Sequence, residues 1–359
     1  MKEVFNITTE NLAVSVIIPM YNAEKYIGEC LESLLNQTLK NFEVIVIDDC
    51  STDNSFSIAE NFISEFESEN QLLLVAKITP NSGCPGFPRN AAMNLAKGKY
   101  IFFLDSDDFL DATALEDFYN VAEEFDADVV HAEKCFEYRE IDGKFVNKPL
   151  ILESEAASEK PTLETFDLAK RMTDFVGRQY NSMVWSKFFR REFLIENSIT
   201  FPIITVSEDF IFSAMCLSCA KNYVRVPFIG YHYRQHADSG TALPGTVKES
   251  SLNLIEGVDF FYKFMQKQKF FVDNPKYQYA VLDVFSQMSA DLIFKHTFFN
   301  MNLEPDELYD FYCKNIFSLN PQKNIPLTAY LFVSTNIYKL LVKRQAAEIA
   351  ALKHLLENK

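Results

Sequence analysis

Residues 97–108 read KGKYIFFLDSDD, an apolar run that ends in three carboxylates within four positions. The run from Lys99 to Leu104 has the length and aromatic content of a buried strand. Further apolar runs occur at 14–18, 42–47 and 72–78, and segments with helical periodicity at 26–35, 55–66 and 88–96 separate them. Strands that alternate with helices pair in parallel, so we expect an α/β/α sandwich built on one sheet.

The limits of these elements follow from local chemistry. Proline cannot donate to a sheet ladder, so we expect the first strand to end at Pro19. After residue 150 the alternation weakens, and helices are expected at 188–197 and 210–220. The chain after residue 246 is predicted to be mostly helical. We therefore expect an α/β domain over residues 1–245 and a helical C-terminal region over 246–359.

Composition narrows the class of protein. The chain has 359 residues, of which 48% are hydrophobic and 23% charged, as in an ordinary globular protein, and its formal net charge is −16. So acidic a protein is a poor general binder of nucleic acid. The seven cysteines are scattered and odd in number, which predicts reduced thiols and a cytoplasmic protein. No run reaches the roughly 18 apolar residues that a membrane-spanning helix needs.

Polar clusters follow three of the predicted strands directly: Pro19 to Asn22, Asp48-Asp49, and Asp105 to Asp108. In open sheets of parallel strands, ligands bind at the carboxyl ends of the strands. Three adjacent carboxylates repel one another unless a cation lies among them, so Asp105, Asp107 and Asp108 predict a Mg²⁺ or Mn²⁺ site. The alternative is a solvated turn with helix-capping acids. Asp49 is expected to accept hydrogen bonds from a nucleobase or ribose, with a loop cap as the alternative.

Two common nucleotide-binding patterns are absent from the first strand-to-helix turn. It has neither the Gly-x-Gly-x-x-Gly of dinucleotide-binding oxidoreductases nor the glycine-rich loop ending in Gly-Lys-Ser/Thr. A nucleotidyltransferase that makes sugar nucleotides would also need a glycine-rich first loop with a basic residue, which Pro19 to Asn22 does not provide.

The polar clusters and their surroundings together resemble glycosyltransferase family 2. The resemblance rests on blocks in the order and spacing of that family: VSVIIPMYN at 14–22, SLLNQT at 33–38, VIDDCSTD at 46–53, NSG at 81–83, PRNAA at 88–92 and KGKYIFFLDSDD at 97–108. A weaker match continues through VWSK at 184–187, SEDF at 207–210 and YHYRQH at 231–236. Two departures stand out: Cys50 replaces the usual glycine after the Asp pair, and CPGFP at 84–88 replaces a stretch of small residues.

The resemblance implies a GT-A fold, an inverting mechanism and a nucleoside-diphosphate-sugar donor. Asp105 and Asp107 match the Asp-x-Asp motif of the family, which makes Asp107 the best candidate metal ligand, with Asp108 close by. The donor-binding residues that it implies are Pro19, Tyr21, Asn22, Asp49, Arg89, Asp105, Arg234, His236 and Ser239.

The remaining predicted roles concern the acceptor side. Asp209 matches the position of the family's catalytic base, with Glu208 as the neighbouring candidate; the alternative is an acid favoured by the helix dipole. The stretch from Arg234 to Thr241 is expected to fold over the donor phosphates, or else to be a surface loop, and His236 is a candidate third metal ligand. Trp185 is expected to stack on a sugar or, alternatively, to fill the core. Lys187 is expected to approach a phosphate or, alternatively, to be a solvated surface lysine.

The resulting hypothesis is a metal-dependent inverting glycosyltransferase that uses a UDP-sugar and acts on a glycan or lipid-linked saccharide of a bacterial surface. The rival is a non-catalytic sugar-nucleotide-binding subunit. An apolar stripe through Leu340, Leu341, Ile349, Leu352 and Leu356 predicts self-association or peripheral contact with the inner face of a membrane, unless this helix packs on its own catalytic domain.

Overall fold

The computed structural model describes residues 11–141, 144–152, 159–177, 180–205, 207–227, 230–236 and 247–287, together with Thr335 and Lys343. The chain divides into two compact units. The first comprises residues 1–201 and 212–239, and the second comprises 202–211 and 240–359. The expected boundary near residue 245 stays a prediction, although this division groups residues 202–211 with the second unit.

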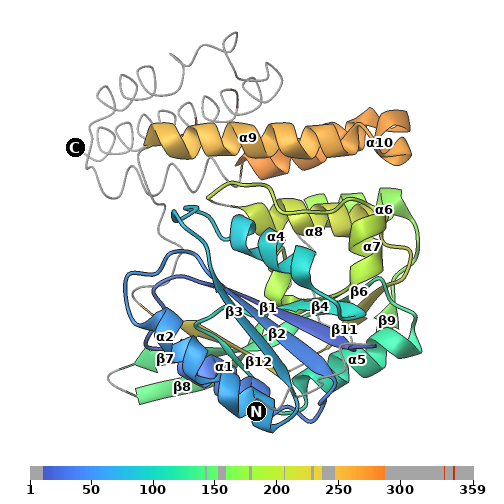
Figure 1. Ribbon diagram of the computed structural model, residues 1–359. Coiled ribbons are helices and arrows are strands. Elements are labelled where there is room, and N and C mark those ends of the chain that lie inside the picture. Colours follow the sequence, from blue (N-terminus) through green and yellow to red (C-terminus); the bar gives the residue numbers. More distant parts are fainter. Residues whose placement is uncertain are drawn as a thin grey trace, which may run out of the picture. The chain divides into compact units, whose positions relative to one another are not determined.

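An eight-stranded sheet forms the centre of the first unit. Four of its strands are the expected apolar runs, and they are parallel neighbours in the order β3-β2-β1-β4. Figure 1 shows these strands running side by side, with α4 near one face. The elements of this half are β1 (Val14–Met20), α1 (Ile27–Leu35), β2 (Phe42–Asp48), α2 (Ser55–Asn61), α3 (Ile63–Ser68), β3 (Leu72–Lys77), α4 (Gly86–Leu95), β4 (Tyr100–Phe103), β5 (Phe109–Leu110) and α5 (Ala114–Glu124).

The prediction that Pro19 ends the first strand is wrong, because β1 continues to Met20. In a parallel ladder the polar groups of alternate residues point to the same neighbouring strand. The carbonyl of Met20 accepts from Asp49 on the β2 side, so the nitrogen of Pro19 faces the β4 side. Pairing with β4 stops at Ile17 opposite Phe103. The missing N–H of Pro19 therefore costs the ladder no hydrogen bond.

Successive side chains along the strands point to opposite faces of the sheet, and both faces are packed. Val16 and Phe102 face a core formed with the apolar stripes of α1 and α5. Phe103 points the other way, to a cluster of rings with Phe189, Phe201 and Phe212. Both faces of the central strands are therefore apolar, which explains why the strands read as continuous hydrophobic runs.

The second half of this unit departs from the sequence prediction. Residues 187–190 form the strand β10 (Lys187–Arg190), which pairs antiparallel with both β4 and β6. The helix expected to begin at Phe188 begins only at Arg191, as α7 (Arg191–Glu196). The aromatic pair Phe188-Phe189 suits a buried strand, and this pairing overrides the helical spacing. The sheet continues through β6 (Val129–Ala132), β11 (Tyr223–Val226) and β9 (Thr162–Leu163).

A second sheet of four strands, in the order β5-β12-β7-β8, was not anticipated. Its hairpin of β7 (Lys134–Ile141) and β8 (Lys144–Ile151) contains charged residues at many positions, so the apolar pattern that marks a strand is weak. Strand β12 (Tyr231–Gln235) pairs with β5 and β7, and so comes close to the residues that follow β4. The unit is completed by α6 (Leu168–Val176), the 3₁₀ turn Val184–Ser186 and most of α8 (Glu208–Cys219).

In the second unit, the described residues 247–287 are mostly helical, as expected for the chain after residue 246. The unit contains α9 (Val247–Met265), α10 (Lys269–Asp273) and a helix over 275–287. Gly257 allows close packing, because a Cβ there would lie 2.8 Å from Ile204 Cδ1 and 3.1 Å from Phe285. Among the described residues, no helix is long and apolar enough to cross a bilayer. The predicted stripe from Leu340 to Leu356 lies outside the described residues.

The amino ends of β1 and β4 are locked together around Gly98. The Gly98 amide donates to Ser15 Oγ at 2.8 Å, and Ser15 Oγ donates to the buried carboxylate of Glu43 at 2.6 Å. The same carboxylate accepts from the Lys97 amide at 2.6 Å. A Cβ at Gly98 would lie 2.4 Å from the Ser15 nitrogen, so only glycine fits between the strands.

We predict that Gly98→Ala lowers the free energy of unfolding by about 1–3 kcal/mol or more, because the methyl group must displace strand backbone. Gly28→Ala is the matched control. Nothing lies within 4 Å of a Cβ at Gly28, in the first turn of α1, so alanine there should add up to about 1 kcal/mol. Urea denaturation of both variants measures the difference. Equal stabilities of the two variants would contradict the packing argument.

Candidate functional site

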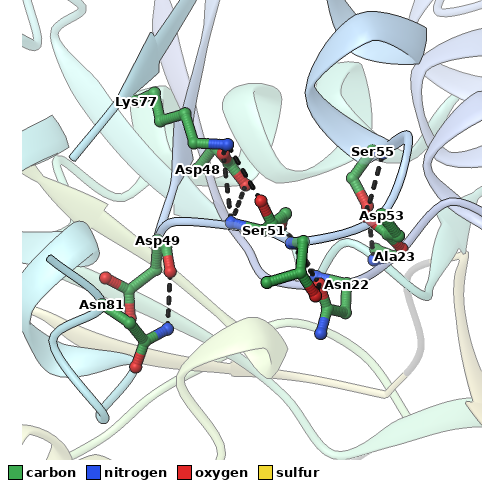
Figure 2. A network of polar contacts seen from close by, with 10 residues as sticks. Asn22, Ala23, Asp48, Asp49, Ser51, Asp53, Ser55, Lys77 and Asn81 are labelled. Carbon is green, nitrogen blue, oxygen red and sulfur yellow. Dashed lines mark hydrogen bonds and ion pairs between the residues drawn. The ribbon is translucent and has the colours of Figure 1, made fainter. Parts of the chain in front are cut away.

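The carboxyl end of β2 holds a network of hydrogen bonds that shapes the neighbouring turns (Figure 2). Asp48 is fully buried, forms an ion pair with Lys77 at 3.1 Å and accepts from the Ser51 amide at 3.2 Å. Lys77 Nζ also donates to the Ser51 carbonyl at 2.9 Å. These partners come from the turn itself and from Lys77 at the end of β3, so Asp48 has a structural role.

Asp49 faces the loop that follows β3. Its carboxylate accepts from the amide and the hydroxyl of Ser82 at 2.8 and 2.7 Å, and its carbonyl accepts from Asn81. Its side chain is 5% exposed. The next residue, Cys50, adopts a φ of +64°, the left-handed conformation that the usual glycine tolerates at less cost. Cys50 therefore adopts a backbone conformation that glycine would also adopt.

The end of β1 contributes three of the predicted donor-binding residues, Pro19, Tyr21 and Asn22. Tyr21 is 52% exposed, Pro19 is half-buried, and both lie beside the end of β2. Asn22 is engaged with the turn after β2: its amide donates to Ser51 Oγ at 2.9 Å, and its side-chain oxygen accepts from the Thr52 amide at 2.9 Å (Figure 2). Tyr21 therefore offers the open aromatic face at this edge, whereas Asn22 holds the two turns together.

Arg89 and Asp105 form an ion pair. Arg89, in α4, is 4% exposed, and its Nη2 lies 2.9 Å from Asp105 Oδ1. Its guanidinium also lies over the ring of Phe201 at 5.3 Å. The family resemblance places Arg89 near the diphosphate or ribose of the donor, and in the structure its charge is directed at Asp105, which is itself 27% exposed.

Asp107 meets His236, 129 positions later in the chain. Asp107 Oδ2 lies 2.9 Å from His236 Nε2, and the two side chains are 28% and 15% exposed. The imidazole packs on the ring of Tyr26, with 4.4 Å between ring centroids. The structure thus brings together a carboxylate and an imidazole that the sequence proposed as ligands of the same ion.

Asp108 lies beneath this pair and is 1% exposed. Its Oδ2 accepts from the Tyr231 hydroxyl at 2.5 Å, and its Oδ1 accepts from the Arg234 amide at 2.7 Å. Burial, together with the charges of Asp107 and Asp105, raises the pKa of Asp108 well above its usual range. Both carboxylate oxygens are committed to β12, which favours a structural role for Asp108 over the predicted metal ligation.

Arg234 is enclosed by three aromatic rings. Its guanidinium lies 5.2–5.3 Å from the ring centres of Tyr26, Phe109 and Tyr138. It also forms an ion pair with Glu29 in α1, and its Nε donates to the Asp107 carbonyl at 2.8 Å. The Arg234 side chain is 7% exposed, and its hydrogen bond to the Asp107 carbonyl stabilises that turn. The expected contact of Arg234 with the donor phosphates stays a prediction.

The pair of Asp107 and His236 fits a divalent cation better than the cluster of Asp105, Asp107 and Asp108 does. In the part of the chain that the structure describes, no three acidic, histidine or cysteine side chains converge as a metal site. Asp107 and His236 are adjacent and reachable, whereas Asp108 is enclosed and Asp105 faces Arg89. Mg²⁺ is commonly held by one or two protein ligands, with substrate phosphates and water completing its shell. The residues present therefore fit a cation that binds together with a diphosphate.

The two predicted acceptor contacts are interior residues. Trp185 is 5% exposed and stacks between Tyr231 and Tyr233, with centroid distances of 4.4 and 5.4 Å. Lys187 is 1% exposed, and its Nζ donates to the carbonyls of Asn181 and Met183 at 3.0 and 2.7 Å. These placements favour the core-filling alternative for Trp185 and a structural role for Lys187.

The predicted base and its neighbour open α8. Glu208 is 7% exposed and Asp209 is half-buried, so Asp209 is the more accessible of the two. Ser207, just before the helix, has a φ of +63°. Both acids belong to the second unit. Ser239, the last predicted donor contact, lies outside the described residues.

Sequence reasoning missed the residues that hold the acidic turn in place, chiefly Tyr26, Glu29 and Tyr231. Each acts on a residue far away in sequence: Tyr231 reaches Asp108 across 123 positions, and Glu29 reaches Arg234 across 205. Helical periodicity places Tyr26 at the start of α1 but assigns it to an apolar stripe. Tyr231 stands in the YHYRQH block, but nothing in the sequence near Tyr26, Glu29 or Tyr231 shows which distant residue each of them contacts.

Comparison with known proteins identifies the domain. The profile of glycosyl transferase family 2 matches residues 15–180. The chain is 35% identical over 225 residues to the poly(ribitol-phosphate) beta-glucosyltransferase of Bacillus spizizenii, which covers 62% of this chain and 32% of that protein. It is 33% identical over 222 residues to the poly(ribitol-phosphate) beta-N-acetylglucosaminyltransferase TarS of Staphylococcus aureus, covering 61% and 35%. The chain thus spans about a third of the length of these two relatives.

Solved structures agree on the fold. The crystal structure of S. aureus TarS 1-349 in complex with UDP-GlcNAc superposes with a TM-score of 0.55 and 23% identity, over 90% of this chain and 79% of that chain. The complex of the same protein with UDP gives 0.57 and 20%, over 94% and 92%. The expected GT-A sandwich with helices on its C-terminal side is confirmed, and residues 15–180 form a domain of glycosyltransferase family 2.

Proposed function

We propose that this chain transfers a sugar from a UDP-sugar to a hydroxyl group of a polyol-phosphate or glycan polymer. The observation that carries the proposal is the contact of His236 with Asp107 at the carboxyl edge of the sheet, the same edge at which exposed Tyr21 and the polar turn at Asp49 follow β1 and β2. The names of the two relatives support the acceptor class, and the UDP and UDP-GlcNAc complexes of TarS support the donor class.

On the donor side, Tyr21 would stack on the nucleobase and the turn at Asp49 would meet its polar edge. Asp107 and His236 would hold the divalent cation, which supplies positive charge for the leaving diphosphate when it is bound. This assignment leaves Asp108, Arg234 and Tyr231 as the support of the turn rather than as ligands. Mn²⁺ and Mg²⁺ both suit a site of one carboxylate and one imidazole.

On the acceptor side, an inverting transfer needs a base that takes the proton of the acceptor hydroxyl. As that oxygen bonds to the anomeric carbon, the bond from this carbon to the diphosphate breaks. Asp209 is our candidate base. Its greater exposure than Glu208 at the start of α8 supports this choice over its neighbour, and its position in the SEDF block matches the base of the family.

The proposal is tested first with a panel of nucleotide sugars, with and without Mn²⁺. A ligand at 100 times its dissociation constant stabilises the folded state by about 2.7 kcal/mol, so a true donor raises the melting temperature. The same donor should then give UDP and a glycosylated polymer. A nucleotide sugar that stabilises the chain but is never cleaved, with any acceptor or with water, would favour the non-catalytic subunit.

Substitutions of Asp107 and Asp108 are predicted to affect different properties, UDP binding in the first case and stability in the second. Asp107→Asn should weaken Mn²⁺-dependent UDP binding and abolish transfer, with the stability of the fold unchanged. Asp108→Ala should instead lower the free energy of unfolding by about 1–3 kcal/mol, because it leaves the Tyr231 hydroxyl and the Arg234 amide unpaired. Asp108→Asn, which keeps one acceptor, should recover most of that loss. Calorimetry with UDP and urea denaturation provide the two readouts; a stable Asp108→Ala that no longer binds Mn²⁺ would make Asp108 a ligand.

Asp209→Asn is predicted to lower turnover by at least ~100-fold, the usual range for loss of a general base, with little change in donor affinity. Glu208→Gln serves as the matched variant and should reduce turnover less. Single-turnover kinetics with donor calorimetry separates the two effects. Normal turnover of Asp209→Asn, or a loss explained by weaker donor binding, would reject Asp209 as the base.

A further inference from the structure

A cavity lies at the opposite edge of the sheet, and none of the roles assigned above uses it. Its volume is about 650 Å³, within the usual range for ligand pockets. Its walls come from the amino end of β1, the loop before β4 and the junction of β10 with α7. The seven residues of β1, at about 3.3 Å each, separate it from the carboxyl edge by roughly 20 Å.

Four cations line this cavity in a protein whose net charge is −16. Two of them are neutralised: Lys99 pairs with Glu123 at 2.5 Å, and Arg190 pairs with Asp126 at 2.6 Å. In the described part of the chain, no ion pair involves Lys97 or Arg191. These two cations are therefore available to an anionic group from outside the chain.

The cations stand on a rigid frame. The Lys97 amide is tied to the buried Glu43, and Gly98 leaves no space beside Ser15. Arg191 Nε donates to the Gly98 carbonyl at 2.9 Å, and its amide donates to the Lys99 carbonyl at 2.9 Å. The backbone of Lys97 and the side chain of Arg191 are thus held in place before any ligand binds.

The other lining groups indicate which anion would fit. Glu192 and Glu196 are exposed carboxylates, which accept hydrogen bonds from hydroxyl groups, and Ile195 and Tyr119 offer apolar surface. A membrane surface rich in anionic lipid would instead need a flat basic face rather than a cavity. Cations, carboxylates and apolar surface together suit a chain of phosphodiesters and hydroxyl groups.

From this cavity we infer that the amino edge of the sheet is an accessory binding site for a polyol-phosphate or sugar-phosphate polymer. The inference rests on the proposed function, since the polymer is the proposed acceptor. A chain held at this edge while another of its hydroxyls reacts at the carboxyl edge is bound at two points. Such binding raises the effective concentration of the reacting end without any new contact at the catalytic site.

The experiment measures binding and transfer separately. A fluorescent polyol-phosphate oligomer, long enough to span both edges, is titrated in the absence of donor with the full chain and three variants. Lys97→Glu should weaken binding about tenfold, Lys97→Arg should restore it, and Lys160→Glu, at an exposed lysine outside the cavity, should have no effect. In transfer assays Lys97→Glu should raise the KM for the long acceptor by a similar factor and leave a single-repeat acceptor unchanged.

The outcomes distinguish this inference from the proposed function. Equal binding of the oligomer by the wild-type chain and Lys97→Glu would overturn the accessory site, even if sugar transfer is observed. Binding that depends on Lys97 would support the site even if no nucleotide sugar is ever consumed, in which case only the proposed function fails. Vesicles of anionic lipid are the further arm: binding to vesicles that depends on Lys97, with none to the oligomer, would assign the cavity to a membrane and overturn the inference.

Discussion

The buried carboxylate of Asp108 is the constraint on which the acidic edge depends. A buried carboxylate without partners is costly, and this one is satisfied entirely by β12, through the Tyr231 hydroxyl and the Arg234 amide. That requirement joins the end of β4 to a strand more than 120 residues later in the chain. Once β12 lies there, Arg234 reaches the Asp107 carbonyl and His236 reaches the Asp107 carboxylate. The partly exposed pair of Asp107 and His236 is therefore a consequence of the way Asp108 is buried.

The same constraint explains why the three carboxylates have different surroundings. The sequence presents Asp105, Asp107 and Asp108 as one cluster, and mutual repulsion suggested that one cation neutralises them together. In the fold, Arg89 neutralises Asp105, burial with hydrogen bonds accommodates Asp108, and Asp107 meets the imidazole of His236. The last arrangement places a carboxylate beside an imidazole, and both side chains are partly exposed. Neighbouring acids on a turn point in different directions. A sequence with three adjacent carboxylates therefore does not place all three where one ion could bind them.

Sequence reasoning predicted the parallel half of the sheet well, because apolar runs of four to seven residues between amphipathic helices have few other solutions. It failed where long-range pairing decides the structure. Phe188 and Phe189 fit a helical stripe as well as a buried strand, and only the gap between β4 and β6 selects the strand. The site was predicted to the same extent: the residues at strand ends were found, whereas Tyr26, Glu29 and Tyr231 act across more than a hundred positions and leave no local pattern.

Arg234 is held in place by contacts within the chain. The family resemblance implies that it binds the donor, which stays a prediction, and in the structure three rings and Glu29 surround the guanidinium. Aromatic faces stabilise a cation and exclude water, so an arginine can be held in place without a ligand. Lys97 presents the opposite case, since its backbone is fixed by Glu43 while its ammonium group pairs with no acid of the described chain. Lys97 and Arg191 thus lie at the amino edge of the sheet, whereas Arg89 and Arg234, at the acidic motif, both pair with acids of the chain itself.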